Sequence, residues 1–311
     1  MLVGLAAVVW SADKFIDGAA ATARSLGVSP LMVGITIVGF GTSAPEILIS
    51  IFAALQGNPG LAVGNAIGSN IANIALILGG TACFYTLFIS QSIARKEMPF
   101  LVIVQVLVLV LVLDGALDRL DGSILIAALI AVMGRTIYQG YRSTTVESDD
   151  DDGDADLRKA LLSLFVGLIV LLASSRLLVW AAVEIATVMG VSDLVIGLTI
   201  VAIGTSLPEL AACIASARIR AYEIAIGNII GSNVFNSLAV VGISALIHPA
   251  DLPVGVWTRD LPIAIGLGLI LLVLSLRKNN QAASLGRVFG VAMLICFIAY
   301  QFSLFFFSSM S

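Results

Sequence analysis

The sequence predicts an all-α, polytopic membrane protein with ten transmembrane helices, arranged as two inverted five-helix repeats. Of its 311 residues, 59% are hydrophobic and only 12% are charged, whereas a soluble domain is nearer half apolar and a quarter charged. A bilayer-spanning helix needs roughly 20 apolar residues, so this length has room for about ten spans with short loops. The two halves of the chain also repeat one sequence pattern at a fixed offset.

The composition excludes several classes of protein. A soluble globular enzyme and a disordered chain are excluded by the high apolar content. A nucleic-acid-binding protein is excluded by the charge balance, because 16 Lys and Arg residues stand against 20 Asp and Glu residues. Since a charge within a bilayer is costly and usually functional, the positions of the few charged residues become the informative feature.

The repeat consists of two blocks in each half. Residues 34–50 read GITIVGFGTSAPEILIS, and residues 197–213 read GLTIVAIGTSLPELAAC. The second block, AVGNAIGSNIANIALILG at 62–79, returns as AIGNIIGSNVFNSLAVVG at 225–242. Both pairs share the offset of 163 residues, so the motif regions 34–79 and 197–242 derive from one duplicated unit.

Each repeat is expected to contain five spans. The first repeat covers 1–142, the second covers 160–311, and an acidic cytoplasmic linker, which includes ESDDDDGDAD, joins them over 143–159. The expected spans are roughly 1–23, 29–56, 61–89, 98–113, 122–141, 160–187, 192–216, 224–247, 260–276 and 287–307. An odd number of spans places the second repeat in the membrane upside down relative to the first, as in many secondary transporters.

Loop charge predicts the orientation. Basic residues concentrate in cytoplasmic loops. With the N-terminus outside, the inner loops and nearby span ends carry twelve basic residues: Arg24, Arg95, Lys96, Arg135, Arg142, Arg158, Lys159, Arg218, Arg220, Arg277, Lys278 and Arg287. The outer side carries only Arg119 and Arg259. We therefore expect both termini outside and the central linker inside.

Polar residues interrupt one apolar span in each half. In the first, Thr42, Ser43 and Glu46 surround Pro45, which breaks the helix because proline lacks an N–H group. Thr42 and Glu46, four residues apart, are expected on one helix face. The second half repeats this set as Thr205, Ser206, Pro208 and Glu209. A broken helix within a membrane is tolerated only where it is buried in protein or lines a polar cavity.

The next span in each half contributes hydroxyl and amide groups. Ser69 and Asn73 are four residues apart, as are Ser232 and Asn236. A further four asparagines lie on other faces, where helix packing is the favoured role and ion binding the alternative: Asn65, Asn70, Asn228 and Asn233.

These side chains offer only hard oxygen donors, which suit calcium, magnesium or sodium and argue against zinc or copper. No basic residue lies within either motif, so a bound cation is the natural partner of Glu46 and Glu209. A proton is the alternative occupant when no cation is bound.

At these residues the chain resembles the cation/calcium exchanger superfamily, in particular the sodium/calcium exchangers of bacteria and archaea. The pattern G-T-S-x-P-E stands at 41–46 and 204–209, and G-N-x-x-G-S-N-x-x-N stands at 64–73 and 227–236. The resemblance implies alternating access in the plasma (bacterial inner) membrane, with cytosolic Ca²⁺ leaving in exchange for entering Na⁺.

The resemblance also implies roles for individual residues. Glu46 and Glu209 would bind Ca²⁺, and Asn73 and Asn236 would complete the ring. Six hydroxyl side chains would coordinate Na⁺: Thr42, Ser43, Ser69, Thr205, Ser206 and Ser232. The backbone carbonyls of Gly39 and Ala202 match positions that contribute to such sites.

Two carboxylates balance one Ca²⁺ or two Na⁺ ions, so a third Na⁺, usual in the family, would leave the site positive. The potassium-dependent branch carries Asp where this chain has Asn236, and Asn resembles the potassium-independent branch. We expect no catalytic activity, no cofactor beyond the transported ions, no obligate protein partner and a monomer in the lipid bilayer. A proton/cation exchanger on the same scaffold and, less favoured, a passive cation channel are the alternatives.

Overall fold

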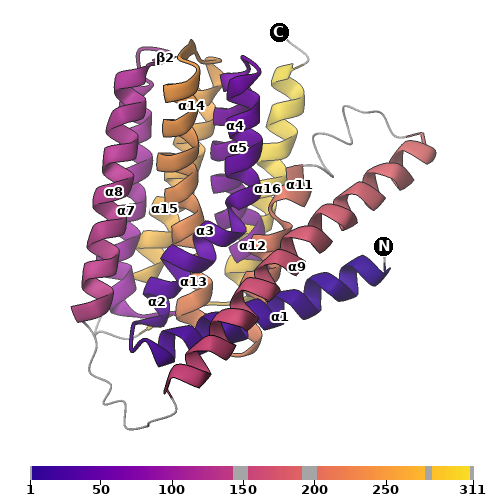
Figure 1. Cartoon of the computed structure of the whole chain (residues 1–311). Coiled ribbons are helices and arrows are strands. Elements are labelled where there is room, and N and C mark those ends of the chain that lie inside the picture. The colour runs from indigo at the N-terminus through magenta and orange to yellow at the C-terminus, as the bar shows by residue number, and fades with distance from the viewer. Residues whose placement is uncertain (1, 143–152, 191–201, 277–281, 309–311) are drawn as a thin grey trace.

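The computed structural model describes residues 2–142, 153–190, 202–276 and 282–308, and these residues are almost entirely helical (Figure 1). The predicted linker over 143–152 and the motif residues 197–201 lie outside the described residues.

The elements of the first half follow the expected spans closely. In chain order they are α1 (Leu2–Ser25), α2 (Pro30–Val33), η1 (Gly34–Val38), α3 (Gly39–Thr42), α4 (Ala44–Leu55), α5 (Pro59–Ala72), η2 (Asn73–Leu78), α6 (Gly79–Phe84), β1 (Leu87–Ile89), α7 (Gln91–Leu111), β2 (Ala116–Leu117) and α8 (Arg119–Arg142). The segments labelled η are π-helical turns, which allow a helix to continue across a local irregularity.

The second half repeats this order. Its described elements are α9 (Gly153–Val188), α11 (Ala202–Thr205), α12 (Leu207–Arg218), α13 (Tyr222–Val234), η4 (Phe235–Val240), α14 (Val241–Ile247), β3 (Ala250–Asp251), η5 (Val256–Asp260), α15 (Leu261–Ser275), β4 (Ala283–Leu285) and α16 (Arg287–Ser308). Because α9 begins at Gly153, the last seven residues of the expected linker, 153–159, belong to a helix instead.

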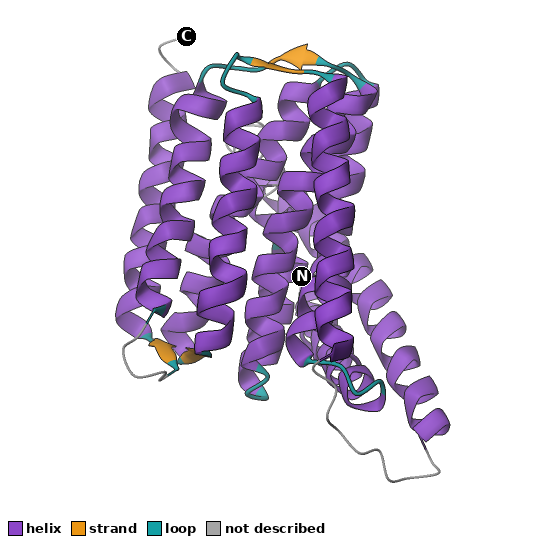
Figure 2. Ribbon diagram, turned by 90° about the vertical axis from the view of Figure 1, so that its left-hand side faces the viewer, coloured by secondary structure: helices purple, strands orange, loops and turns teal. Residues whose placement is uncertain are grey.

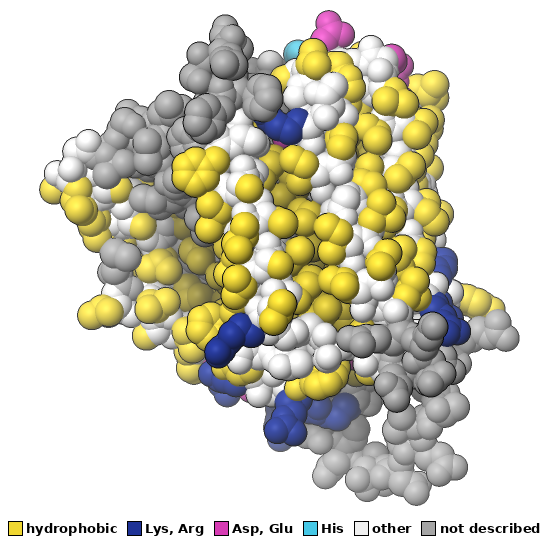
Figure 3. Space-filling model, turned by 180° about the vertical axis from the view of Figure 1, so that it is seen from behind, with side chains coloured by type: hydrophobic (Ala, Val, Ile, Leu, Met, Phe, Trp, Pro, Cys, Tyr) yellow, Lys and Arg dark blue, Asp and Glu magenta, His cyan; other side chains and the backbone are white. Residues whose placement is uncertain are grey.

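Length and composition make these helices membrane spans. Six uninterrupted helical runs in the described chain are long and apolar enough to cross a bilayer, and the bent run from α2 to α4 makes a seventh. The helices α1 and α7 fall short of the same criterion because each carries at least three charged residues. Figure 3 shows a broad apolar surface, with basic side chains gathered at its lower end. The predicted class, an all-helical polytopic membrane protein, is confirmed.

Corresponding elements of the two halves begin and end at the same offset. Adding 163 to the bounds of α3 and α4 gives the bounds of α11 and α12 without any shift. The short strands follow the same relation. The strand β1 pairs with β4 at the lower end of the molecule, while its counterpart β3 pairs with β2 at the upper end (Figures 1 and 2).

The centre of the molecule is formed by the two spans that contain α5 and α13. The most apolar windows of these spans are 72% and 89% buried, against 22% for the spans of α8 and α16. The motif residues on α5 and α13 are therefore enclosed by protein. The helices α1 and α9 pack against each other and run obliquely along one flank of the bundle (Figure 1).

Candidate functional site

The helix breaks position the candidate site. The run Pro30–Thr42 and the helix Ala44–Leu55 meet at Ser43 with a bend of 47°. The prediction that Thr42 and Glu46 share one continuous helix face is therefore wrong, because the proline-induced break separates them. In the second half, Ser206 likewise separates α11 from α12, with Pro208 in the first turn of α12.

Thr42 links the first motif to α13 of the second repeat. Its hydroxyl donates to Asn228 Oδ1 at 3.0 Å and lies 3.4 Å from Ser232 Oγ. Ser232 Oγ in turn donates to the carbonyl oxygen of Gly39 at 3.4 Å. Residues nearly 190 positions apart in the chain thus contact one another inside the membrane domain.

Ser43 reaches the carboxylate of the other repeat. Its hydroxyl donates to Glu209 Oε1 at 3.2 Å, and the Asn228 amide donates to the Glu209 backbone carbonyl at 3.3 Å. Because Ser43 lies only three residues before Glu46, this contact brings the two motif carboxylates into one polar cluster.

The motif carboxylates have oxygen atoms to spare. Glu46 and Glu209 are each 1% exposed. Within the described residues, neither Glu46 oxygen has a hydrogen-bond partner, nor does Glu209 Oε2. An unpartnered buried carboxylate is costly, so these three oxygens require a cation or a proton.

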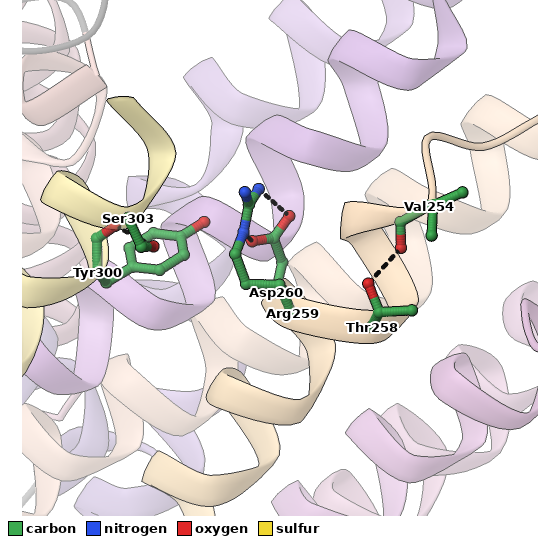
Figure 4. Close-up of polar contacts among 6 residues, drawn as sticks. All are labelled: Val254, Thr258, Arg259, Asp260, Tyr300 and Ser303. Atoms are coloured by element: carbon green, nitrogen blue, oxygen red, sulfur yellow. Dashed lines mark hydrogen bonds and ion pairs between the residues drawn. The ribbon is translucent and has the colours of Figure 1, made fainter. Parts of the chain in front are cut away.

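Two other buried acids provide a contrast. Glu97 Oε2 lies 3.5 Å from Arg135 Nη1. Asp260 accepts from its neighbour Arg259 at 2.7 Å, and the Tyr300 ring is turned toward this pair (Figure 4). Glu97 and Asp260 occupy equivalent positions of the two repeats. Repetition and burial alone therefore do not mark a site; the motif glutamates differ because no basic side chain among the described residues pairs with them.

The amides of the second motif blocks form the other part of the cluster. Asn73 Nδ2 donates to Asn233 Oδ1 at 3.2 Å, which leaves Asn73 Oδ1 without a partner among the described residues. Asn236 is 1% exposed, and its amide group makes no hydrogen bond to any described residue. Buried amide oxygens in this state are available to a cation.

The remaining predicted residues lie in the same segments. Ser69 is 7% exposed, Ser206 is buried, and Thr205 is half-buried at the end of α11. Ser206 Oγ has no hydrogen-bond partner in the described part of the chain. Ala202 begins α11, at the position equivalent to Gly39 at the start of α3.

Two residues contribute more than the sequence indicated. Asn228, expected mainly to pack helices, contacts both Thr42 and the Glu209 backbone. Ser237, not singled out from the sequence, accepts from Asn70 Nδ2 at 2.8 Å. The available signal was spacing, because Asn228 lies one turn before Ser232, and Ser237 lies one turn after Asn233.

The two halves of the cluster differ in exposure. Gly64 is exposed, and Asn65 and Gly68 are half-buried, on the face of α5 next to the motif. Their counterparts on α13 are all buried: Gly227, Asn228 and Gly231. On α13 the glycines meet the first-repeat backbone, since a Cβ added at Gly231 would lie 2.2 Å from the Ile35 carbonyl oxygen. The cluster is thus sealed on the α13 side and more open on the α5 side.

Fold and site together describe a polytopic membrane protein with a buried, oxygen-lined cluster built by both halves of the chain. Comparison with known proteins assigns the family. The model of the sodium/calcium exchanger protein family matches residues 1–138 and 159–306, which are the two repeats without the linker. The chain therefore belongs to the sodium/calcium exchanger protein family, whose members are transporters that exchange calcium for other cations.

Individual relatives match over nearly the whole length. CaxA of Alkalimonas amylolytica is 42% identical, with 98% of this chain and 97% of the relative covered. The inner membrane protein YrbG of Escherichia coli is 37% identical, with coverage of 96% and 94%, and the sodium/calcium exchanger MaX1 of Methanosarcina acetivorans is 28% identical, with coverage of 98% and 97%.

Solved structures of the sodium-calcium exchanger NCX_Mj match the fold. In crystals soaked without Na⁺ and Ca²⁺, that protein superposes with a TM-score of 0.85 at 30% identity, and 97% of each chain is covered. The family resemblance predicted from the two motifs is confirmed by all three kinds of comparison.

Proposed function

We propose that the protein is a secondary active antiporter that exchanges Ca²⁺ for Na⁺ at one midplane site formed by both repeats. The observation that carries this proposal is the pair of buried carboxylates, Glu46 and Glu209, which lie among oxygen donors and have no cationic partner in the described chain. The printed names of MaX1 and NCX_Mj supply the same pair of ions.

The ligands divide by chemistry. Glu46 and Glu209 hold Ca²⁺, which prefers six to eight oxygen ligands and favours carboxylates. Asn73 and Asn236 complete this ring with amide oxygens. The Na⁺ ions use the hydroxyl and carbonyl oxygens around the two helix breaks: Thr42, Ser43, Ser69, Thr205, Ser206, Ser232, Gly39 and Ala202. The bound ions are transported substrates, and the protein uses no additional cofactor and works as a monomer.

The proposed architecture is ten spans in two inverted repeats. Equal offsets between the helix breaks of the two halves support the duplication. The positions of β1 and β3 at opposite ends of the bundle support the inversion (Figures 1 and 2). This arrangement places both termini outside the cell and the linker inside, in the bacterial inner membrane, consistent with the printed name of YrbG.

The mechanism is alternating access. The open α5 side and the sealed α13 side correspond to an outward-facing state, because α5 enters the membrane from the proposed outer surface. Exchange of the two environments would open the equivalent α13 side to the cytosol. Each ion drives transport by its different affinity for the two states.

Isotope flux with separate gradients tests this function. The purified protein is reconstituted into liposomes, and ⁴⁵Ca²⁺ uptake is followed with a Na⁺, K⁺ or proton gradient imposed alone. Uptake driven by the Na⁺ gradient and absent in the Glu209→Gln variant is expected. Uptake driven only by the proton gradient would identify a proton/cation exchanger, and uptake without any opposing gradient that shows ohmic currents would identify a channel.

A further inference from the structure

A groove outside the ion cluster lies between α1 and α9. It has a volume of about 280 Å³ and is lined by Trp10 and Lys14 of α1 and by four residues of α9: Lys159, Leu162, Ser163 and Val166. Trp10 is 50% exposed and Leu162 is 66% exposed, so the groove opens on the surface of the bundle, where lipid surrounds the protein.

The walls of the groove are held rigidly. The Ser163 hydroxyl donates to the Lys14 carbonyl oxygen at 2.9 Å. A Cβ added at Gly18 would lie 2.4 Å from the Leu164 backbone nitrogen, and one added at Gly167 would lie 2.4 Å from the Phe15 nitrogen. The two helices therefore touch backbone to backbone beneath the groove, which makes it a preformed surface.

The groove carries two positive charges and no lining acid. Lys14 and Lys159 are exposed, and neither forms an ion pair with another described residue. The nearest acid on α1, Asp13, points to the other side of the helix, where it pairs with Arg218. A lysine in the apolar surface of a span is costly unless its ammonium group reaches water or a lipid headgroup.

Charge and apolar surface are separated along the groove. Lys14 lies opposite Ser163, and Lys159 lies one helical turn below it, toward the start of α9. Trp10 lies one turn away in the other direction, level with the apolar part of α9 that includes Val166. Both cations therefore stand at the proposed cytosolic end, and the aromatic and aliphatic side chains extend toward the middle of the bilayer.

We propose that this groove binds one anionic phospholipid of the cytoplasmic leaflet. The phosphate group lies between the ammonium groups of Lys14 and Lys159, and one acyl chain lies along Leu162, Val166 and Trp10. The lipid bridges α1 and α9 from outside. Its binding is independent of the ion site, so this inference stands apart from the proposed transport function.

Fluorescence quenching of Trp10 tests the site. In a variant with Trp180 and Trp257 replaced by Phe, Trp10 is the remaining tryptophan. The protein is reconstituted with phosphatidylcholine and a rising fraction of phosphatidylglycerol whose acyl chains are brominated. We expect quenching to saturate at a low fraction of brominated phosphatidylglycerol, and to require far more brominated phosphatidylcholine.

Two charge variants distinguish a site from general attraction. A basic residue near an anionic surface contributes about 1 kcal/mol. The Lys14→Gln and Lys159→Gln double variant is therefore expected to weaken phosphatidylglycerol binding about 30-fold. The Lys96→Gln variant removes a similar exposed lysine from α7 and is expected to leave the binding curve unchanged. Equal quenching by both lipids, or equal weakening by Lys96→Gln, would overturn the proposal.

Discussion

Replacement of Glu46 by Gln separates ion binding from structural support. Glutamine has the shape of glutamate but no charge. Because both Glu46 oxygens lack partners among the described residues, the substitution breaks no hydrogen bond found there. We therefore expect the ion-free variant to be at least as stable as the unmodified protein, while its affinity for Ca²⁺ falls.

The size of that fall follows from the burial of the site. Glu46 is 1% exposed, so a bound Ca²⁺ that loses this carboxylate is left partly uncompensated in a buried environment. Removal of one partner from a buried charge pair costs about 3–5 kcal/mol. Since each 1.4 kcal/mol is a factor of ten, the Ca²⁺ affinity should fall by roughly 10²- to 10³-fold.

Thermal unfolding in detergent with and without Ca²⁺ measures both effects. At a Ca²⁺ concentration 100 times the dissociation constant, binding stabilises the native protein by about 2.7 kcal/mol. At the same concentration, a variant with 100-fold weaker binding retains only about 0.4 kcal/mol. The Ca²⁺-dependent increase in the unfolding temperature should therefore almost disappear.

Glu97→Gln is the matched control. This glutamate is also buried, but it pairs with Arg135 at 3.5 Å, and the arginine side chain is 36% exposed. Loss of so partly exposed a pair should cost up to about 1 kcal/mol of stability, with the Ca²⁺-dependent shift intact. An unchanged Ca²⁺ shift in Glu46→Gln would refute the reasoning, as would a Ca²⁺ shift lost equally in both variants.

Three further predictions concern the surroundings of the site. Ser43→Ala removes a hydroxyl that donates to a buried carboxylate, so the Na⁺ concentration for half-maximal exchange should rise about 10-fold or more in flux assays. Gly231→Ala should cost about 1–3 kcal/mol of unfolding free energy, whereas Gly68→Ala should cost little because no described atom lies within 4 Å of the added Cβ; equal melting temperatures would contradict this packing. In a background without native cysteines, Asn65→Cys should react with a membrane-impermeant maleimide added outside, and Asn228→Cys should not; the reverse labelling would contradict the outward-facing assignment.

The helical class and the positions of the breaks were predictable because both follow from local chemistry. Apolar runs long enough to span a bilayer must satisfy their backbone hydrogen bonds internally, so they form helices. Pro45 and Pro208 stop the incoming helix wherever they stand. The duplicated motifs then located the same break in each half, and the observed bounds of α4 and α12 differ by the same 163 residues.

The pairing across the repeats was not predictable from one sequence. The bend at Ser43 turns Thr42 away from the face of Glu46 and toward α13, so the hydroxyl finds Asn228 instead. Spacing along one helix cannot reveal such a partner, because it depends on the angle at which two distant segments cross. The glycine contact at Gly231 sets that crossing, and its neighbour Ile35 lies nearly 200 residues earlier in the chain.

Equilibrium binding of ⁴⁵Ca²⁺ to the purified protein tests the central claim most directly, because the claim is one site shared by two carboxylates and two kinds of ion. The account predicts one Ca²⁺ per chain, displaced competitively by Na⁺, and loss of this binding in both Glu46→Gln and Glu209→Gln. Two independent Ca²⁺ ions per chain, or full binding that persists in either variant, would contradict it.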